Sequence, residues 1–236
     1  MAKLYYRYSA MNAGKSTALL QVAHNYEEHG RKVALFTAEL DHRYGVGFVT
    51  SRLGPQRRSL TFDPSSDFSQ HLRDAPGELS CILIDEAQFL TPDQVRQLHR
   101  IAHVDGVPVI CYGIRSDFLG EPFPGAAYLL TLADSIEEIK TICPCGRKAT
   151  FNVRIDEDGN RVTSGEQIAI EGETRYVQLC GGRQRGDPHS RDVRRRSQAA
   201  RKALRVRVDE RPVGRVEAAA AQLDVTSLAF DRDLLA

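Results

Sequence analysis

The segment Ser9-Ala10-Met11-Asn12-Ala13-Gly14-Lys15-Ser16 decides the fold class of this chain. It follows an apolar run, Leu4–Tyr8, that is typical of a buried strand, and it precedes Thr17–His29, where apolar residues recur at helical spacing. Apart from its first position, the segment matches the Walker A pattern of phosphate-binding loops. The order strand, loop, helix therefore predicts a nucleotide-binding α/β domain.

Each residue type in this loop has a physical reason to be there. Gly14 lets the backbone wrap a phosphate, Lys15 can reach the β- and γ-phosphates, and Ser16 can ligate Mg²⁺. The departure is Ser9, which stands where the pattern has glycine. A Gly-Lys-Ser tripeptide alone more often marks only a solvated helix start, so the assignment needs a second motif.

The second motif is the apolar run Cys81–Asp85, which is followed by Glu86. It resembles a Walker B strand, whose aspartate holds the hydrated Mg²⁺ beside the hydroxyl of the phosphate loop. Because successive strand residues point to opposite faces, Glu86 can be aimed at an acceptor hydroxyl or at a water molecule. Asp85 is therefore the candidate metal ligand and Glu86 the candidate general base, while the structural alternative is that both acids merely cap the next helix.

The surrounding pattern over the first 140 residues favours a doubly wound parallel sheet. Val33–Thr37 and Val107–Ile114 are typical of further buried strands, and Pro92–His103 has helical spacing with proline in its first turn. Between them, Asp41–Ser66 is rich in glycine, arginine and serine and predicts one long loop. We therefore expect an α/β, P-loop NTPase (RecA-like) parallel sheet flanked by helices, in a nucleotide-binding kinase domain over residues 1–140.

The pattern changes after residue 140. Short alternating segments, Glu166–Ile170 and Arg175–Leu179, predict strands flanked by cysteines, and we expect a small zinc-ribbon-like lasso domain over residues 141–181. Residues 182–236 hold 13 Lys and Arg against 8 Asp and Glu, although the whole chain is only +1. This tail is expected to be basic and to lack a packed core; it is either a real extension or an out-of-frame reading of GC-rich DNA.

Composition limits the class of protein. The chain has 236 residues, 42% of them apolar, which suffices for one full α/β core and a small appendage. No apolar run approaches the roughly 18 residues of a membrane span, and the start lacks the apolar region of a signal peptide. A cytoplasmic location without a membrane partner is therefore expected.

The five cysteines do not suggest a disulfide framework, because their number is odd. Cys81 and Cys111 lie inside apolar runs and are expected to be buried structural thiols. Cys143, Cys145 and Cys180 lie near glycine-rich turns, which indicates either a metal site or free thiols in a reducing compartment.

Beyond these general patterns, five segments carry a specific resemblance. Ser9–Thr17, Thr37–Tyr44, Asp85–Phe89, Tyr112–Phe118 and Thr141–Gly146 resemble the bacterial type II thymidine kinases, and the agreement runs from residue 1 to about 180. Bacterial members of that family often have serine at the first Walker A position, so Ser9 fits the family better than the general motif.

The resemblance implies roles for particular residues. It implies that Glu86 is the catalytic base and that Arg43 and Asp41 lie near the transferring phosphate, which Lys15 neutralises. The implied residues of the ATP and Mg²⁺ site are Ser9, Ala10, Met11, Asn12, Ala13, Gly14, Lys15, Ser16, Asp85, Glu86, Ala87 and Gln88. Those of the thymidine pocket and its closing loop are Met11, Phe89, Ile114, Phe118, Phe123, Ile168, Ala169, Ile170 and Tyr176. Without the family, the aromatic residues would be assigned to ordinary core packing.

The family also implies a structural zinc ion held by four Cys or His residues. Here Cys143, Cys145 and Cys180 supply three ligands, but Arg183 stands where the family has the fourth. A guanidinium cannot ligate Zn²⁺. His189 or water could complete the shell, or the thiols could remain free.

The sequence thus predicts ATP-dependent phosphorylation of thymidine, and of deoxyuridine, at the 5′-hydroxyl. The resemblance further implies a homotetramer and feedback inhibition by thymidine triphosphate. Two alternatives stay open: a RecA-like ATPase acting on nucleic acid, and a non-catalytic zinc-ribbon module that uses the basic tail. Nucleic acid is not the expected partner, because charge runs are more often only solvated.

Overall fold

The computed structural model describes residues 1–41, 43, 45–75, 78–168 and 175–184. The chain divides into two units, Met1–Arg194 and Arg195–Ala236. The second unit lies wholly outside the described residues, as does most of the predicted tail.

A six-stranded sheet organises the first unit, and all of its strand pairs are parallel. The strand order is β5-β2-β6-β7-β1-β8. The strands are β1 (Leu4–Tyr8), β2 (Val33–Ala38), β5 (Leu60–Phe62), β6 (Cys81–Ile84), β7 (Val109–Gly113) and β8 (Ser135–Glu138). In a parallel sheet all carboxyl ends meet at one edge, so the segments after β1, β2, β6 and β7 come together there.

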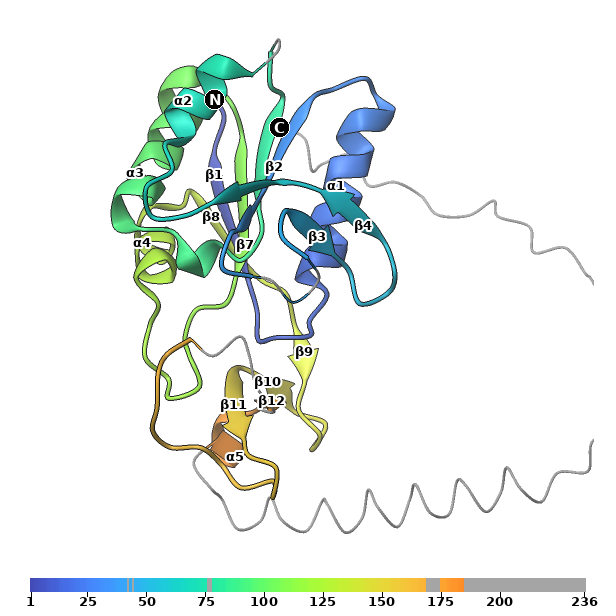
Figure 1. The fold of residues 1–236 in the computed structure, drawn as a ribbon, viewed down its shortest axis with the longest axis vertical. Coiled ribbons are helices and arrows are strands. Elements are labelled where there is room, and N and C mark those ends of the chain that lie inside the picture. The colour runs from blue at the N-terminus through green and yellow to red at the C-terminus, as the bar shows by residue number, and fades with distance from the viewer. Residues whose placement is uncertain (42, 44, 76–77, 169–174, 185–236) are drawn as a thin grey trace, which may run out of the picture. The chain divides into compact units, whose positions relative to one another are not determined.

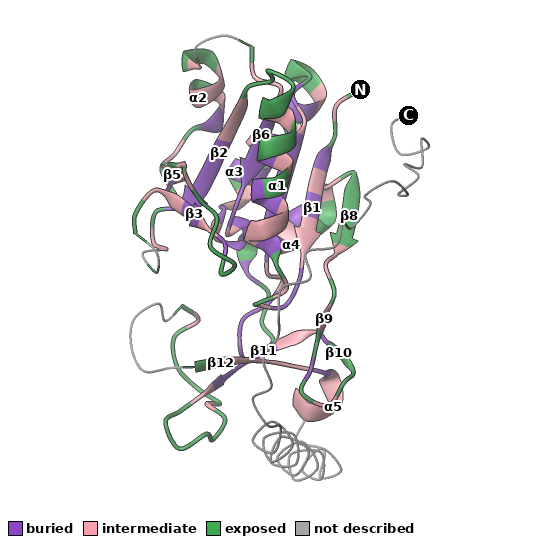
Figure 2. Ribbon diagram, turned by 90° about the vertical axis from the view of Figure 1, so that its right-hand side faces the viewer, coloured by how far each residue is buried: buried purple, intermediate pink, exposed green. Residues whose placement is uncertain are grey.

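Helices cover both faces of the sheet (Figure 1). α1 (Lys15–Glu28) covers one face, and α2 (Phe68–Asp74), α3 (Pro92–Arg100) and α4 (Pro124–Leu132) cover the other. Every residue of β6 and β7 is buried, as central strands between two helical layers require. Figure 2 shows buried residues gathered along the strands of the sheet. Alternation along β6 sends Ile82 and Ile84 into one core cluster and Cys81 and Leu83 into the other.

The local sequence explains where α3 begins. Thr91 accepts a hydrogen bond from Gln94 N, while the Gln94 side chain accepts one from Thr91 N, which is a capping box, and Pro92 occupies the first turn. After Arg100 the helix continues as a π-helical turn, η2 (Ile101–Asp105), so the helix predicted over Pro92–His103 is present but changes its winding.

The prediction of one long loop over Asp41–Ser66 is wrong. Phe48–Thr50 (β3) and Gln56–Arg58 (β4) form an antiparallel hairpin, and β5 then extends the main sheet beside β2. The three strands have three residues each, which is too short for alternation to show. Each is stabilised by pairing with another strand, β3 with β4 and β5 with β2, which a three-residue pattern does not show.

Beyond residue 140 the chain forms a small lobe of short strands. β9 (Thr141–Ile142) pairs with β10 (Lys148–Ala149), and β11 (Phe151–Ile155) pairs with β12 (Arg175–Leu179), both antiparallel. A short helix, α5 (Gly181–Gln184), follows. The strand predicted over Glu166–Ile170 is wrong for residues 166–168, which are irregular, and its last two residues lie outside the described ranges.

The fold class predicted from sequence, a parallel α/β sheet flanked by helices with a small Cys-containing lobe, is confirmed. Cys81 and Cys111 are fully buried, as expected of structural thiols. Among the helices that can be described, none has both the length and the apolar character needed to cross a bilayer.

Candidate active site

The phosphate loop turns sharply between β1 and α1. Two of its residues adopt left-handed backbone conformations, Asn12 with φ 61° and Gly14 with φ 87°. Gly14 is the residue before the first turn of α1, and no side chain caps that turn. The free N–H groups and the positive end of the helix dipole are therefore available to an anion.

Lys15 is buried within its own loop, with 8% of its surface exposed. Its Nζ lies 3.2 Å from Ser9 Oγ and 3.4 Å from the carbonyl oxygen of Ala10. Burial lowers the pKa of Lys15, and the charges of Glu86 and Asp85 partly offset that effect. The side chain at the first Walker A position thus serves as a partner for the lysine, which a glycine could not provide.

Ser16 and Asp85 meet as the two motifs predict. The Ser16 hydroxyl donates to Asp85 Oδ2 at 2.8 Å, although 69 positions separate the residues in sequence. Asp85 is only 4% exposed, and its burial together with the charge of Glu86 raises its pKa to about 6. A hydroxyl and a carboxylate at this distance fit the ligand set for Mg²⁺ beside a nucleotide.

Glu86 follows β6 with φ 51°, a left-handed conformation that is uncommon for a residue with a side chain. Its Oε2 accepts a hydrogen bond from Gln88 Nε2 at 2.6 Å, and Gln88 Oε1 in turn accepts from Ile114 N at 3.1 Å. The turn η1 (Ala87–Phe89) is thereby tied to the end of β7. The carboxylate is held in one orientation, with its side chain 15% exposed.

Arg43 connects the loop after β2 to this carboxylate. Its Nε and Nη2 each donate to one oxygen of Asp41 at 2.7 Å, and Nη2 also donates to Glu86 Oε1. These partners raise the pKa of Arg43 above its already high value, so the side chain stays cationic. The site therefore places two cations, Lys15 and Arg43, beside three carboxylates.

One cavity of about 1160 Å³ joins the phosphate loop to an aromatic pocket. The pocket is built by contacts between elements: Phe89 and Phe123 meet edge to face with ring centres 5.7 Å apart. The turn carrying Phe118 is closed by Asp117, whose Oδ1 accepts from the backbone N–H of residues 119, 120 and 121. Tyr176 of β12 completes the pocket from the small lobe.

The structure brings most of the predicted site residues to this cavity. Those that line it are Met11, Asn12, Ala13, Gly14, Lys15, Ser16, Asp41, Arg43, Glu86, Gln88, Phe89, Ile114, Phe118, Phe123, Ile168 and Tyr176. Four others are buried and are not among the residues that line the cavity: Ser9, Ala10, Asp85 and Ala87. Ala169 and Ile170 lie outside the described residues.

Sequence reasoning missed further residues of the wall. The β3–β4 turn supplies Ser51 and Arg52, and β11 supplies Asn152, whose Oδ1 accepts from Met11 N at 2.7 Å and so ties the small lobe to the phosphate loop. Polar residues within the strand Phe151–Ile155 were a usable signal, because a buried polar side chain needs a specific partner. Ser51 and Arg52 gave no such signal in a segment that predicted a loop.

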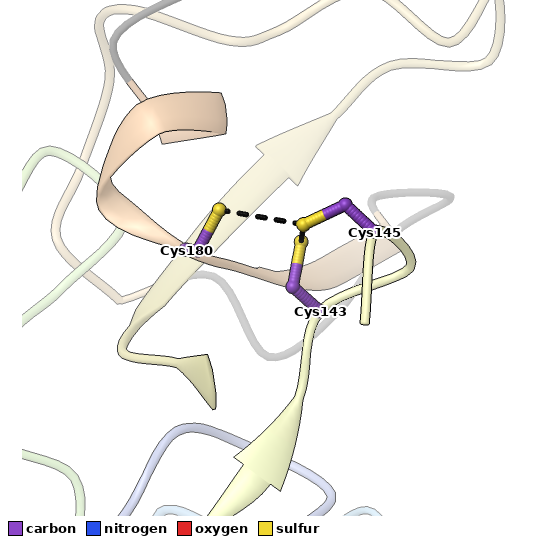
Figure 3. A group of neighbouring side chains, drawn as sticks. All are labelled: Cys143, Cys145 and Cys180. Atoms are coloured by element: carbon purple, nitrogen blue, oxygen red, sulfur yellow. Dashed lines mark hydrogen bonds between the residues drawn. The ribbon is translucent and has the colours of Figure 1, made fainter. Parts of the chain in front are cut away.

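The three cysteines of the small lobe converge as predicted (Figure 3). The Sγ of Cys145 lies 3.3 Å from that of Cys143 and 3.6 Å from that of Cys180, and all three lie within 4.8 Å of one another. Zn–S bonds of about 2.3 Å at tetrahedral angles put sulfurs about 3.8 Å apart, so the three thiols fit three corners of a zinc site. Arg183, in the helix after Cys180, supplies no fourth ligand.

Comparison with known proteins decides the family. The sequence model of the family described as Thymidine kinase matches residues 2–183. The chain belongs to the thymidine kinase family. The thymidine kinase of Chromobacterium violaceum is 60% identical over 181 residues, which are 77% of this chain and 97% of that protein. The thymidine kinase of Albidiferax ferrireducens is 54% identical over 180 residues, 76% of this chain and 90% of that protein.

A solved structure, that of Pif1 helicase from Candida albicans, aligns with 61% of this chain and 37% of that protein at 15% identity. Its TM-score of 0.37 is too low to bear on fold or function. Membership of the thymidine kinase family makes this chain a kinase, and hence a nucleotide-binding transferase. The family match ends at the helix that carries Arg183.

Proposed function

We propose that this protein transfers the γ-phosphoryl group of ATP to the 5′-hydroxyl of thymidine, and also of deoxyuridine, with Glu86 as general base. One observation carries the proposal: Glu86 lines the same cavity as the residues of the phosphate loop and those of the aromatic pocket. A base between a triphosphate site and a nucleoside site is what phosphoryl transfer to a nucleoside hydroxyl requires.

The reaction follows from these positions. Glu86 takes the proton of the 5′-hydroxyl, whose oxygen bonds to the γ-phosphorus as the bond to the β,γ-bridging oxygen breaks and ADP leaves. Gln88 and Arg43 hold the carboxylate by hydrogen bonds to its two oxygens. Lys15 and the N–H groups of the loop stabilise the charge on the phosphates, and Arg43 assists at the transferring group.

The metals have separate parts in this proposal. Ser16 and Asp85 would hold Mg²⁺, which would neutralise negative charge on the phosphates. Cys143, Cys145 and Cys180 would hold zinc, which would fix the β9–β10 turn to the end of β12. Residues 1–140 then form the kinase domain and 141–181 the lasso domain that carries the closing loop.

The pocket predicts which nucleosides react. The part of the cavity lined by Met11, Phe89 and Phe118 is apolar and partly aromatic, and we expect it to accept the single ring of a pyrimidine and to reject the two rings of a purine. Thymidine and deoxyuridine should therefore be phosphorylated and deoxyguanosine should not.

A radiolabelled-phosphate transfer assay across the deoxynucleosides tests the function directly. Lys15→Ala is the control, because it should weaken both ATP binding and transfer. Equal phosphorylation of deoxyguanosine would contradict the pocket assignment. ATP hydrolysis that depends on DNA and ignores thymidine would replace the kinase by an ATPase that acts on nucleic acid.

The assembly and its regulation follow from the family resemblance. A homotetramer is expected, with feedback inhibition by thymidine triphosphate. Light scattering of the purified chain measures the first, and addition of thymidine triphosphate to the transfer assay measures the second.

A further inference from the structure

Arg154, in the middle of β11, is a buried cation, only 5% exposed. None of the ion pairs recorded among the described residues includes it. A buried charge without a counter-ion is costly, so its remaining contacts must stabilise it.

Those contacts join two residues of the aromatic pocket. The guanidinium lies over the ring of Phe118, 3.9 Å from its centre, which is a cation–π contact in a desolvated place. Its Nε and Nη2 both donate to the hydroxyl oxygen of Tyr176, at 3.2 and 3.1 Å, and Nη2 also donates to the carbonyl oxygen of Glu166 at 3.0 Å. One side chain therefore fixes both Phe118 and Tyr176.

The two hydrogen bonds from Arg154 determine which further hydrogen bond the Tyr176 hydroxyl can form. A phenolic hydroxyl has one proton to donate and an oxygen that accepts. Because the guanidinium fork occupies the oxygen, the hydroxyl is left as a donor, and a donor polarised by a neighbouring cation. Tyr176 lines the cavity, and no acceptor for its proton is recorded within the described ranges.

We propose that Arg154 is a positioning residue that commits the Tyr176 hydroxyl to donate a hydrogen bond to an oxygen of the bound nucleoside, a base carbonyl or the 3′-hydroxyl. The inference rests on the proposed function, since it places the nucleoside in this part of the cavity. A substrate that presented a donor at this point would leave two donors facing each other, so the pair selects for an acceptor.

Steady-state kinetics of the full-length chain test the pair. Tyr176→Phe keeps the ring and should lower kcat/KM for thymidine about tenfold, as expected for one lost hydrogen bond, while KM for ATP changes less than about twofold. Arg154→Gln should have at least as large an effect on thymidine. Arg161→Gln, an exposed arginine of the same lobe, is the matched control and should be neutral.

The double variant separates positioning from packing. If Arg154 acts through Tyr176, adding Tyr176→Phe to Arg154→Gln should cost little more than Arg154→Gln alone. Fully additive losses, about tenfold on top of the Arg154→Gln value, would overturn the proposal. If Arg154→Gln does not fold, Tyr176→Phe assayed with thymidine analogues still shows whether the hydroxyl donates to the nucleoside, and a neutral Tyr176→Phe overturns the proposal.

Three analogues identify the acceptor: 2-thiothymidine, 4-thiothymidine and 3′-deoxythymidine each lack one strong acceptor oxygen. With one of them the loss caused by Tyr176→Phe should vanish, because the contact is already absent. If the loss persists with all three, or if Tyr176→Phe is neutral toward thymidine, the proposal is wrong. If the wild-type chain does not phosphorylate thymidine at all, the proposed function itself fails, which is a distinguishable result.

Discussion

At the scale of single residues, Glu86 combines an unfavourable backbone conformation with a carboxylate that is held by hydrogen bonds. Its left-handed conformation costs on the order of 1 kcal/mol, and it is kept because η1, Gln88 and Arg43 hold the turn. Backbone strain that is kept at a cavity wall is typical of a functional site. The sequence motif could suggest the carboxylate, but the turn that aims it depends on contacts far along the chain.

Glu86→Gln tests the general base. The amide keeps the size of the side chain but cannot accept a proton, so kcat should fall about 100-fold or more while ATP still binds. Transfer assays and nucleotide titration measure both quantities. Glu39→Gln, at an exposed position after β2, is the control and should keep full activity. Wild-type turnover in Glu86→Gln would remove this residue from the mechanism.

The raised pKa of Asp85 predicts how the stability of the protein depends on pH. Its pKa is about 6 in the fold and about 3.9 in an unfolded chain, so between these values the folded state holds more protons. The contribution of Asp85 to the free energy of unfolding therefore falls as pH rises from about 4 to 6, and it stays at this lower value at higher pH.

Asp85→Asn removes this titration. Without nucleotide or Mg²⁺, the stability of the variant relative to wild type should increase on the order of 1 kcal/mol between pH 5 and pH 7.5. Urea unfolding at the two pH values measures the difference, and Asp158→Asn, at an exposed turn, is the comparison. A relative stability that does not change with pH would mean that burial does not control this carboxyl.

At the scale of elements, the sequence predicts strands whose apolar pattern persists over several residues, and it misses strands of only three residues. Leu4–Tyr8 and Arg175–Leu179 agree with β1 and β12, because alternation or continuous apolar residues persist over five positions. β3, β4 and β5 have three residues each; β3 and β4 pair with each other, and β5 pairs with β2, which lies more than twenty residues earlier. The same limit hid Arg52, which enters the cavity wall only because that hairpin forms.

The contact between α4 and η1 gives an element-scale prediction. A Cβ on Gly125 would lie 2.5 Å from the carbonyl oxygen of Leu90 and 2.9 Å from those of Ala87 and Gln88. Because these are backbone atoms of the turn that aims Glu86, Gly125→Ala must separate the two elements. We expect a loss of roughly 1–3 kcal/mol in stability, with a lower kcat.

Thermal unfolding and transfer assays of Gly125→Ala measure the two effects. Gly181→Ala is the matched control, since its Cβ would meet only Phe151 Cε2 at an ordinary 3.7 Å. Unchanged melting temperature and kcat in Gly125→Ala would show that the close approach does not hold the catalytic turn.

At the scale of the whole molecule, the small lobe reaches the kinase core through Asn152, which accepts from Met11 N, and through Tyr176 in the cavity wall. The lobe has only a small core of its own, formed around Cys143, Ala149 and Cys180. A metal at the cysteines would therefore affect how firmly the lobe presents its pocket residues. The sequence could identify the three thiols, their shared site and the missing fourth ligand, but not the distances between the sulfurs, which depend on how the β9–β10 turn packs against the end of β12.

Arg183→His tests whether a metal at the cysteines stabilises the lobe, because histidine would supply the fourth ligand that the family resemblance implies at this position. A complete tetrahedral site binds zinc more tightly than three thiolates with an exchangeable fourth ligand, so zinc content after dialysis should rise toward one per chain. Tighter binding to the folded state alone adds stability by mass action: each tenfold gain in affinity is worth about 1.4 kcal/mol, or a few degrees in melting temperature.

Arg183→Gln removes the same charge without offering a ligand, and it should leave zinc content unchanged. Metal analysis and thermal unfolding, with and without a chelator, measure both effects. If the histidine variant gains no zinc, or gains zinc without any rise in melting temperature, the cysteine cluster does not stabilise the lobe through metal.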